Sequence, residues 1–290
     1  MNIIFAIICV ILFSLTAPFT RLAALEAHAE TIILIRILGA GVICIIFGLF
    51  DRWIPPRSVW KNIFATALGS VIGFNALMAY GLREVPSGHA AVALAALPMA
   101  TAVYSILRDK LNPGKKFWFF SILGTLLSFG FFFSLNVKSF ALGDIYLLLS
   151  VASAALGYVE GGRVSRVYGG RRTMTWAVLF TLPVVIPLSI WYFSKNSNSL
   201  TLISQQAWFS MSYLALFSQS MGMFLWFRVL AIGPMEKIAL IQLLQPFLTL
   251  FAAIFLLHEH VEMITWIVAI LVALCVFGTS REKNKIEQIR

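Results

Sequence analysis

The stretch "GPMEKIALIQLLQPFLTLFAAIFLLHEH", residues 233–260, sets two amides and a proline inside a run of apolar residues long enough to cross a bilayer. Gln242 and Gln245 stand three residues apart, and Pro246 follows directly. An amide moved into apolar surroundings without a partner costs roughly 1–3 kcal/mol. The two glutamines therefore need partners, and the surroundings of this helix decide which kind.

The composition indicates an integral membrane protein. Of the 290 residues, 60% are hydrophobic and 12% are charged, and the mean hydropathy is +0.90, whereas a soluble domain has about 25% charged residues. Because a helix needs about 20 apolar residues to cross the hydrocarbon, the chain divides into ten spans with short polar joints. The predicted spans are residues 3–19, 31–50, 62–82, 88–107, 117–135, 144–161, 173–193, 207–230, 236–257 and 262–279.

The net charge of +10 is distributed unevenly along the chain. When the joints are assigned alternately to two sides, one side carries 16 Lys and Arg residues and the other carries 4. By the positive-inside rule, the basic side is cytoplasmic, and both termini lie on it. The basic excess is therefore interpreted as a topology signal, and no nucleic-acid partner is expected. The opening "MNIIFAIICVILFSLTAPFT" lacks a charged n-region and a clear cleavage site, so it is interpreted as a retained first helix.

The chain also repeats itself without a gap at a shift of 148 residues. Tryptophans, prolines, serines, threonines and glycines coincide in one register, which shared hydrophobicity does not explain. The matching pairs include Trp60/Trp208, Ser70/Ser218, Pro86/Pro234, Pro98/Pro246, Thr101/Thr249, Trp118/Trp266 and Gly130/Gly278.

Each repeat carries five predicted helices, and five is odd, so the second repeat enters the membrane from the opposite side. The predicted fold is all-α, with ten transmembrane helices arranged as two inverted five-helix repeats around a central cavity. Residues 1–138 form the first repeat, residues 139–280 form the second, and residues 281–290 form a basic cytoplasmic tail. Inverted repeats allow an outward-open and an inward-open state with a site between the halves. Transport by alternating access is the function that this organisation favours.

Two segments resemble a known family: "REVPSGHAAVALAALPMATAVYSIL", residues 83–107, and "AIGPMEKIALIQLLQPFLTLFAAIFLLHE", residues 231–259. Each has a joint with proline, then a helix with a second proline, as in the EamA-like branch of the drug/metabolite transporter superfamily. Arg36 in "AETIILIRILGAG" fits an arginine that the family often has in its second helix, and Glu259 fits a glutamate that often follows the ninth. The pattern departs at "RDKLN", residues 108–112, where a glutamate is expected and Asp109 is the nearest acid.

The resemblance covers essentially the whole chain. It implies a ten-helix basket whose central cavity is built largely by helices 1, 3, 4, 6, 8 and 9, with helices 5 and 10 at the periphery. Its motifs are specific for the fold and weak for the substrate, since the superfamily includes exporters of amino acids, drugs and other metabolites. The aromatic fifth span, "KFWFFSILGTLLSFGFFFSL", suits a position facing lipid or a second copy of the chain, so a homodimer through peripheral helices stays an option.

Candidate site residues are the polar groups inside the spans, because such groups are costly in lipid and usually face the bundle interior. Arg36 either reaches the membrane interface or a structural partner, or it contacts a substrate carboxylate. Each of the other candidates could equally be an interhelical hydrogen-bonding group. The remaining substrate-binding candidates are Asn75, His89, Tyr158, Gln219, Trp226, Gln242 and Gln245.

Pro98 and Pro246 occupy equivalent mid-helix positions in the two repeats, so paired helix bends are predicted to act in gating. The same shift places Leu94 and Leu97 opposite Gln242 and Gln245. The second repeat therefore keeps the proline that bends the helix, and it has amides where the first repeat has leucines. Either the amides bind the substrate, or they bond a neighbouring helix or the carbonyls that Pro246 frees.

Other function classes find less support. In "LLHEHVE", His258 and His260 stand two apart, not at the i, i+4 spacing of helical metal ligands, so no metal site or cofactor is expected and a membrane-embedded enzyme is the competing class. No Asp or Glu lies at the middle of a span, which favours facilitated efflux over strong proton coupling, with Glu160 as the nearest candidate. A multidrug or organic-cation exporter lacks an evident counter-charge. The prediction is a bacterial inner-membrane carrier that exports a small polar or amphipathic metabolite, namely an amino acid or a related compound.

The charge distribution generates a topology test. Reporters fused to both termini should report the cytoplasm, and a reporter in the joint near Lys195 should report the periplasm. A periplasmic C-terminus would contradict an arrangement of ten helices in two inverted repeats.

Overall fold

The computed structural model describes residues 3–109, 115–116, 118–120, 122–124, 126–127, 142–196, 200–201, 203–232 and 241–287. Throughout these residues the secondary structure is helical and no strand occurs, so the predicted all-α class is confirmed. The helices of the first half are α1 Ile3–Ser14, α2 Thr16–Ala24, α3 Ala29–Asp51, η1 Arg57–Val59, α4 Trp60–Thr66, η2 Ala67–Gly73, α5 Phe74–Glu84, α6 Ser87–Ala95 and α7 Leu97–Asp109. Those of the second half are α9 Leu142–Tyr168, α10 Gly170–Leu179, α11 Leu182–Lys195, α13 Gln205–Tyr213, η3 Leu214–Gly222, α14 Met223–Ile232, α16 Gln245–Leu257 and α17 Met263–Glu287.

Several of these helices join end to end into membrane-length rods. Six rods are long and apolar enough to cross a bilayer, and the pair α10 and α11, bent by 45°, would make a seventh. Two shorter apolar helices, Gln245–Leu257 and Met263–Cys275, follow. The predicted span 117–135 lies largely outside the described residues, as do residues 236–240 of the ninth span. A multi-pass membrane protein is thus supported, while the count of ten and the inverted arrangement stay predictions.

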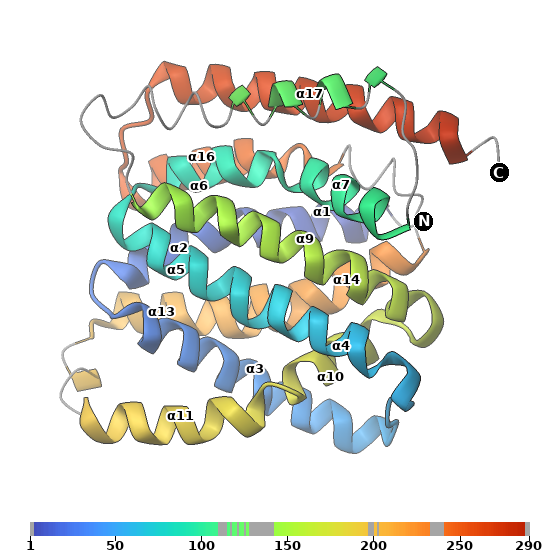
Figure 1. Ribbon diagram of the computed structural model, residues 1–290. Helices are drawn as coiled ribbons and strands as arrows, with labels where there is room; N and C mark the ends of the chain where they lie inside the picture. The colour runs from blue at the N-terminus through green and yellow to red at the C-terminus, as the bar shows by residue number, and fades with distance from the viewer. Residues whose placement is uncertain are drawn as a thin grey trace.

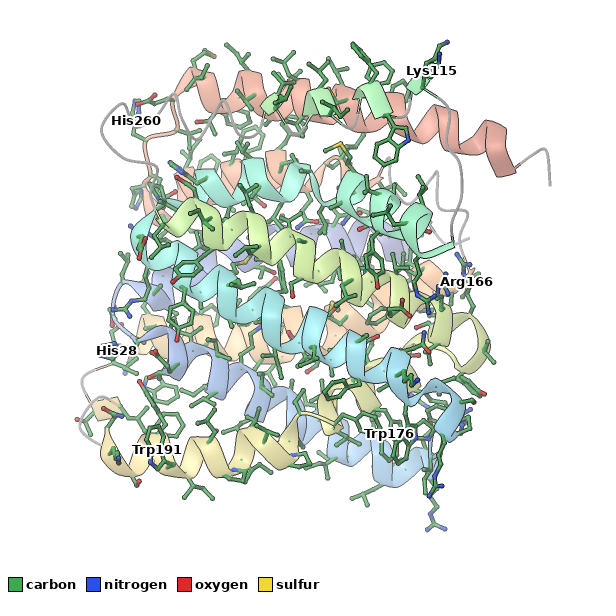
Figure 2. All side chains as sticks on the ribbon, in the orientation of Figure 1. His28, Lys115, Arg166, Trp176, Trp191 and His260 are labelled. Carbon is green, nitrogen blue, oxygen red and sulfur yellow. The ribbon has the colours of Figure 1, made fainter. Side chains whose placement is uncertain are left out.

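The rods lie side by side and share a common direction, so the molecule has two ends (Figure 1). Figure 2 places Arg166 and Lys115 at one end and His28 and His260 at the other. We call these the Arg166 end and the His260 end. Helix α1 begins, and α17 ends, at the Arg166 end (Figure 1). Helix α17 runs along one edge of the stack, as the resemblance implied for the tenth helix.

Two segments in the middle of spans wind as π-helices, η2 at residues 67–73 and η3 at residues 214–222. A shift of 148 residues carries η2 onto 215–221, inside η3, so the wide turns occupy equivalent positions in the repeat. A π-turn displaces backbone carbonyls from their usual partners, and Asn75 Nδ2 donates to the Val71 carbonyl at 2.7 Å. Wide turns of this kind are frequent at functional sites.

Small residues on α9 let the wide turn η2 approach it closely. Ser153, Gly157 and Gly161 recur every four residues and so share a face of α9. A Cβ at Gly157 would collide with Ser70 Oγ and lie 2.6 Å from the Ser70 nitrogen. Ser153 Oγ also donates to the Gly69 carbonyl at 3.1 Å. The close packing of these two helices therefore depends on the absence of a side chain at residue 157.

Replacing Gly157 with alanine should separate α9 from η2 and lower the thermal unfolding temperature of the purified protein in detergent. Overpacking of this kind costs about 1–3 kcal/mol. Gly162→Ala on the same helix is the matched control, because its added Cβ would find no neighbour nearer than 3.8 Å. Equal unfolding temperatures for the two variants would show that the contact at residue 157 is not tight.

Candidate functional site

A central cavity lies between the two halves of the chain. Its volume, measured for the centre of a water-sized sphere, is about 10 Å³, which leaves room for about one water molecule. The structure is therefore closed around its centre, and a larger molecule would enter only through a rearranged state. The lining residues are Phe13, Thr16, Arg36, Ser70, Phe74, Leu94, Leu97, Tyr158, Ser218, Gln219, Met223 and Gln245.

Arg36 supplies the charge of this cavity. It lies on α3 and is only 3% exposed, so its side chain stays inside the protein rather than reaching the membrane interface. Its Nη2 donates to Ser218 Oγ at 2.8 Å, and the Ser218 hydroxyl shares a second hydrogen bond of 2.8 Å with Thr16 Oγ1. Among the described residues, its Nε has no hydrogen-bond partner and no carboxylate forms an ion pair with it. Arg36 is thus a buried cation held by neutral groups.

An amide pair joins the two halves beside this charge. Asn75 on α5 donates through Nδ2 to Gln219 Oε1 at 2.6 Å, and both side chains are buried. Gln219 belongs to η3, so the bond connects a residue two positions after one wide turn to a residue within the other. Asn75 Oδ1 and Gln219 Nε2 have no partners within the described residues. Each predicted amide thus satisfies the other only in part.

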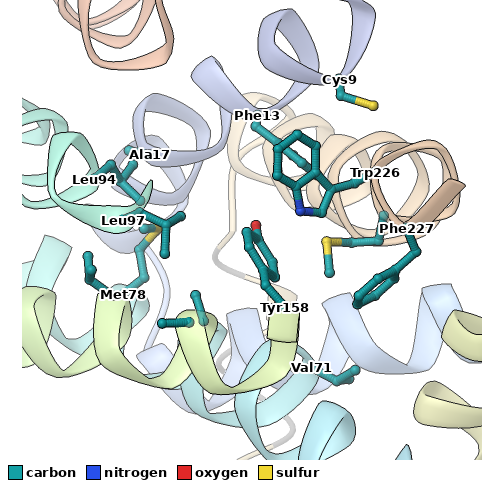
Figure 3. Close-up of a cluster of buried hydrophobic side chains, with 14 of the residues drawn as sticks. Cys9, Phe13, Ala17, Val71, Met78, Leu94, Leu97, Tyr158, Trp226 and Phe227 are labelled. Atoms are coloured by element: carbon teal, nitrogen blue, oxygen red, sulfur yellow. The ribbon is translucent and has the colours of Figure 1, made fainter. Parts of the chain in front are cut away.

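Aromatic side chains form another wall of the cavity (Figure 3). Tyr158 from α9 lines the cavity, with its ring centre 5.6 Å from that of Trp226 on α14. Trp226 in turn packs edge-on against Phe13 at 5.9 Å. Trp226 does not itself line the cavity, but its indole Nε1 is buried without a partner in the described part of the chain. Trp226 therefore supports Phe13 and Tyr158 from behind.

The two glutamines of residues 233–260 lie at the start of α16 and one turn before it. Gln245 begins α16 and lines the cavity, whereas Gln242 lies one turn earlier, 6% exposed, with an Nε2 that finds no partner among the described residues. Leu94 and Leu97, their equivalents at the 148-residue shift, line the same cavity. The two repeats therefore present apolar and amide groups to one space.

Both predicted hinge prolines lie in the first turn of a helix that follows a break. Pro98 follows the break at Ala96 between α6 and α7, and Pro246 follows the turn at residues 243–244 before α16. A proline is tolerated at such a position. The backbone N–H that it lacks would have no hydrogen-bond partner in the first turn of a helix. The breaks are real features of the fold, and their part in gating stays a prediction.

Buried polar atoms without a partner gather at the centre. Within the described residues there are eight such side-chain atoms, and six of them lie on cavity-lining or adjoining groups. Such atoms are rare in folded proteins and need an explanation. Four of the six are nitrogen donors, so the centre offers more donors than acceptors. The six are Arg36 Nε, Ser70 Oγ, Asn75 Oδ1, Gln219 Nε2, Trp226 Nε1 and Gln242 Nε2.

His89 lies away from this centre. It lines a second hollow of about 320 Å³ at the His260 end, which we call the vestibule. His89 Nδ1 lies 2.7 Å from Oδ1 of Asp144, a residue in the first turn of α9 that is fully buried. Asp144 was not among the residues predicted from the sequence, although an aspartate at the start of an apolar span is a visible signal. The vestibule is lined by Glu84, Val85, Pro86, Gly88, His89, Glu259, His260, Val261, Glu262 and Thr265.

The "LLHEHVE" segment closes one side of the vestibule. His258, with φ of 53°, ends α16 in the left-handed conformation. The Glu259 carboxylate then accepts hydrogen bonds from the Ser87 nitrogen at 3.1 Å and from Ser87 Oγ at 2.6 Å, and Arg21 Nε lies 3.9 Å away. The described residues hold no group of three or more His, Cys, Asp or Glu side chains suited to a metal ion. Glu259 therefore connects the second half to the N-terminus of α6.

A second carboxylate cluster lies toward the Arg166 end. Glu160 on α9 is 4% exposed and accepts hydrogen bonds from Asn62 Nδ2, from Arg108 Nε at 2.9 Å and from Tyr104 Oη at 3.3 Å. Arg228, by contrast, is exposed, with its guanidinium over the Phe5 ring at 5.0 Å. Glu160 joins the second half to two spans of the first. Asn62, Tyr104 and Arg108 carry no sequence signal for this role.

Comparisons with known proteins agree with this architecture. The model of the EamA-like transporter family matches residues 1–135 and again residues 141–281. The uncharacterized transporter YdeK of Bacillus subtilis (strain 168) is 37% identical over 273 residues, which are 94% of each chain. The uncharacterized transporter YvbV of the same organism is 22% identical over 282 residues, covering 95% of this chain and 91% of YvbV. A solved crystal structure aligns over 98% of both chains with a TM-score of 0.62 and 14% identity, which shows similarity of fold alone.

The glutamines generate a test of whether the amides serve packing or ligand binding. Gln242→Leu and Gln245→Leu, which restore the pattern of the first repeat, should leave the unfolding temperature of the protein in detergent unchanged or raised. The reason is that Gln242 Nε2 has no partner among the described residues, and an amide without a partner costs roughly 1–3 kcal/mol when buried. Asn75→Leu is the comparison, because it removes the three observed hydrogen bonds of Asn75 Nδ2 and should lower the unfolding temperature. A drop with the glutamine variants as large as that with Asn75→Leu would make the amides packing elements.

Proposed function

Since the chain belongs to the EamA-like transporter family, we propose that it exports a small metabolite bearing a carboxylate, an amino acid or a related compound, across the bacterial inner membrane by alternating access. The observation that carries this proposal is the buried guanidinium of Arg36, which has no anionic partner in the described part of the chain. Burying a charge in a low-dielectric interior costs several kcal/mol unless an opposite charge compensates it. A carboxylate of the substrate would supply that charge.

The donors around Arg36 support the same class of substrate. A carboxylate has two oxygens with about four acceptor sites. Arg36 Nε and Gln219 Nε2 are donors with no partner in the described residues, and both residues line the cavity. Two donors directed at one planar acceptor group give orientation as well as attraction. A substrate without an acceptor group would leave these two donors without a hydrogen-bond partner.

The rest of the lining suits the other groups of an amphipathic amino acid. Leu94, Leu97 and Phe74 offer an apolar surface. Ser70 Oγ and Asn75 Oδ1 are acceptors without partners near the cavity, and an α-amino group is a donor. Among the described residues the lining contains no carboxylate, so it offers no counter-charge to a bulky organic cation.

Alternating access needs the two ends to open in turn. In the closed structure, Glu259 and Ser87 connect the halves at the His260 end, and Glu160 and Arg108 connect them toward the Arg166 end. We propose that breaking one connection at a time opens one end, with the breaks at Pro98 and Pro246 as hinges. The two consecutive family matches, residues 1–135 and 141–281, support two repeats, which we propose to be residues 1–138 and 139–280. In this proposal, both termini are cytoplasmic, because the Arg166 end carries the basic excess.

A thermal-shift experiment on the purified protein tests the proposal. L-phenylalanine, L-leucine and L-methionine at millimolar concentration should raise the unfolding temperature, because a ligand at about 100 times its Kd stabilises the folded state by about 2.7 kcal/mol. Arg36→Gln should abolish this shift without lowering the unfolding temperature of the ligand-free protein. Arg228→Gln, at an exposed cation over the Phe5 ring, is the matched control and should keep the shift.

The competing substrate class gives the opposite result. If quaternary amines stabilise the protein and the amino acids do not, the carrier handles organic cations. If the amino acids stabilise Arg36→Gln as well as the unmodified protein, Arg36 does not bind the carboxylate. Efflux of the stabilising compound from proteoliposomes then separates a carrier from a receptor.

A further inference from the structure

Two buried donors of the central cavity have no acceptor in the described part of the chain. They are Arg36 Nε and Gln219 Nε2, and both side chains line the cavity. Arg36 is 3% exposed and Gln219 is 1% exposed, so neither group is in contact with bulk water. Their positive charge and their hydrogen atoms are therefore available only to a particle inside the cavity.

The hydroxyl groups of Thr16 and Ser218 supply a further donor. Their oxygens lie 2.8 Å apart, so one hydroxyl donates to the other. Ser218 Oγ also accepts from Arg36 Nη2 at 2.8 Å. Whichever hydroxyl accepts the bond within the pair keeps its own hydrogen atom for another acceptor, and both side chains line the cavity. An acceptor in the cavity would thus meet a guanidinium, an amide and a hydroxyl.

The size of the cavity limits what can lie there in the closed structure. Its volume of about 10 Å³, measured for the centre of a water-sized sphere, suits one particle of about the size of a water molecule. An amino acid is much larger, so the carboxylate of the proposed substrate does not compensate the charge of Arg36 in this conformation. The guanidinium is nevertheless buried here. Its charge needs another counter-ion when the carrier is closed without substrate.

A small anion fits this place better than a water molecule does. A buried water brings two donors of its own, and it leaves the charge of Arg36 uncompensated, which is costly in a low-dielectric interior. A monatomic anion only accepts, and it accepts from any direction. It also brings the negative charge, because among the described residues no carboxylate lines the cavity or pairs with Arg36. Chloride is little larger than water and sheds its hydration shell more readily than fluoride.

We propose that the closed, substrate-free protein binds one chloride ion at Arg36, and that chloride and the substrate carboxylate compete for this guanidinium. The inference rests on the proposed function, because it assigns the same arginine to both anions. It adds a step to the transport cycle. The chloride ion leaves before the carboxylate binds, and another takes its place after the carboxylate is released, so the charge of Arg36 is compensated in both states.

The unfolding temperature of the purified protein in detergent tests the proposal. Chloride replaces sulfate stepwise at constant ionic strength, in a buffer without carboxylates. Sulfate stabilises folded proteins in general because it is excluded from their surface, so a non-specific salt effect predicts a falling unfolding temperature. Binding at Arg36 predicts a rise instead, with the stabilisation proportional to the logarithm of the chloride concentration well above the Kd. Radioactive chloride should bind at about one ion per chain.

Three variants assign the rise to the cavity. Arg36→Gln removes the charge and should abolish both the rise and the binding of radioactive chloride. Gln219→Glu should abolish them as well, because its carboxylate can keep one oxygen for Asn75 Nδ2 and present the other to the cavity as a permanent counter-charge. This variant should also unfold at a higher temperature than the unmodified protein when chloride is absent. Arg228→Gln, at an exposed cation over the Phe5 ring, is the matched control and should keep the rise.

The contrary outcomes are equally definite. The proposal is overturned if the unmodified protein binds no radioactive chloride, or if its unfolding temperature only falls as chloride replaces sulfate. A rise that survives Gln219→Glu, or that disappears with Arg228→Gln, also overturns it. Gln219→Glu decides alone if Arg36→Gln does not fold.

Competition separates this proposal from the proposed function. Chloride at ten times its own Kd should raise the apparent Kd of a stabilising amino acid about tenfold. An amino acid that binds through Arg36 with the same Kd at every chloride concentration refutes the chloride site and keeps the carrier. Chloride binding that depends on Arg36, in a protein that no carboxylate stabilises, refutes the proposed substrate class and keeps the chloride site.

Discussion

The fold depends on one constraint, which is that the hydrocarbon of a bilayer offers no hydrogen bonds. Helices satisfy their own backbone, and whatever a helix leaves over must be satisfied by a neighbour. The contact between α9 and η2 shows how this is done. Gly157 lets the two backbones approach, and Ser153 and Asn75 donate to carbonyls of the wide turn. Close packing and polar compensation are therefore parts of one solution.

Because a bilayer offers no hydrogen bonds, the buried polar atoms without a partner at the centre of the protein need an explanation. Most described polar side chains inside the bundle have partners, as Thr249 does through the Ser14 carbonyl at 3.0 Å. The exceptions concentrate around Arg36 and Gln219, where the chain could have placed apolar residues at no polar cost. A site that must release its ligand cannot satisfy all its polar groups with protein alone. The unsatisfied donors are consistent with a site that is complete only when the ligand is bound.

The sequence was sufficient for much of the fold because membrane insertion is a local property of each segment. Hydropathy located most spans to within a few residues, and the spacing of Pro98 and Pro246 located two helix breaks. Arg36, Gln219 and Gln245 were found as intramembrane polar residues, and the structure brings them to one cavity. Asp144 and the partners of Glu160 were not found, because their roles arise from contacts between residues 52 to 98 positions apart. His89 was predicted as a substrate-binding residue and lies in the vestibule, away from the central cavity, and no local pattern of the sequence shows this.

The wide turns were also beyond the sequence, and their serines show where the two halves differ. Both halves keep a π-turn, and Ser70 and Ser218 occupy equivalent positions in the two turns. Ser218 accepts from Arg36, while Ser70 Oγ has no partner among the described residues. The 148-residue shift carries Arg36 onto Val184, which is 66% exposed on α11. The charge therefore exists in one half only. An arginine at residue 184 would lie on the exposed surface of α11 and not in the cavity, so the repeat does not mirror the charge of the centre. Helix packing tolerates different side chains at equivalent positions of the two repeats, so the arrangement of the helices can repeat. The polar groups that line the cavity differ between the repeats.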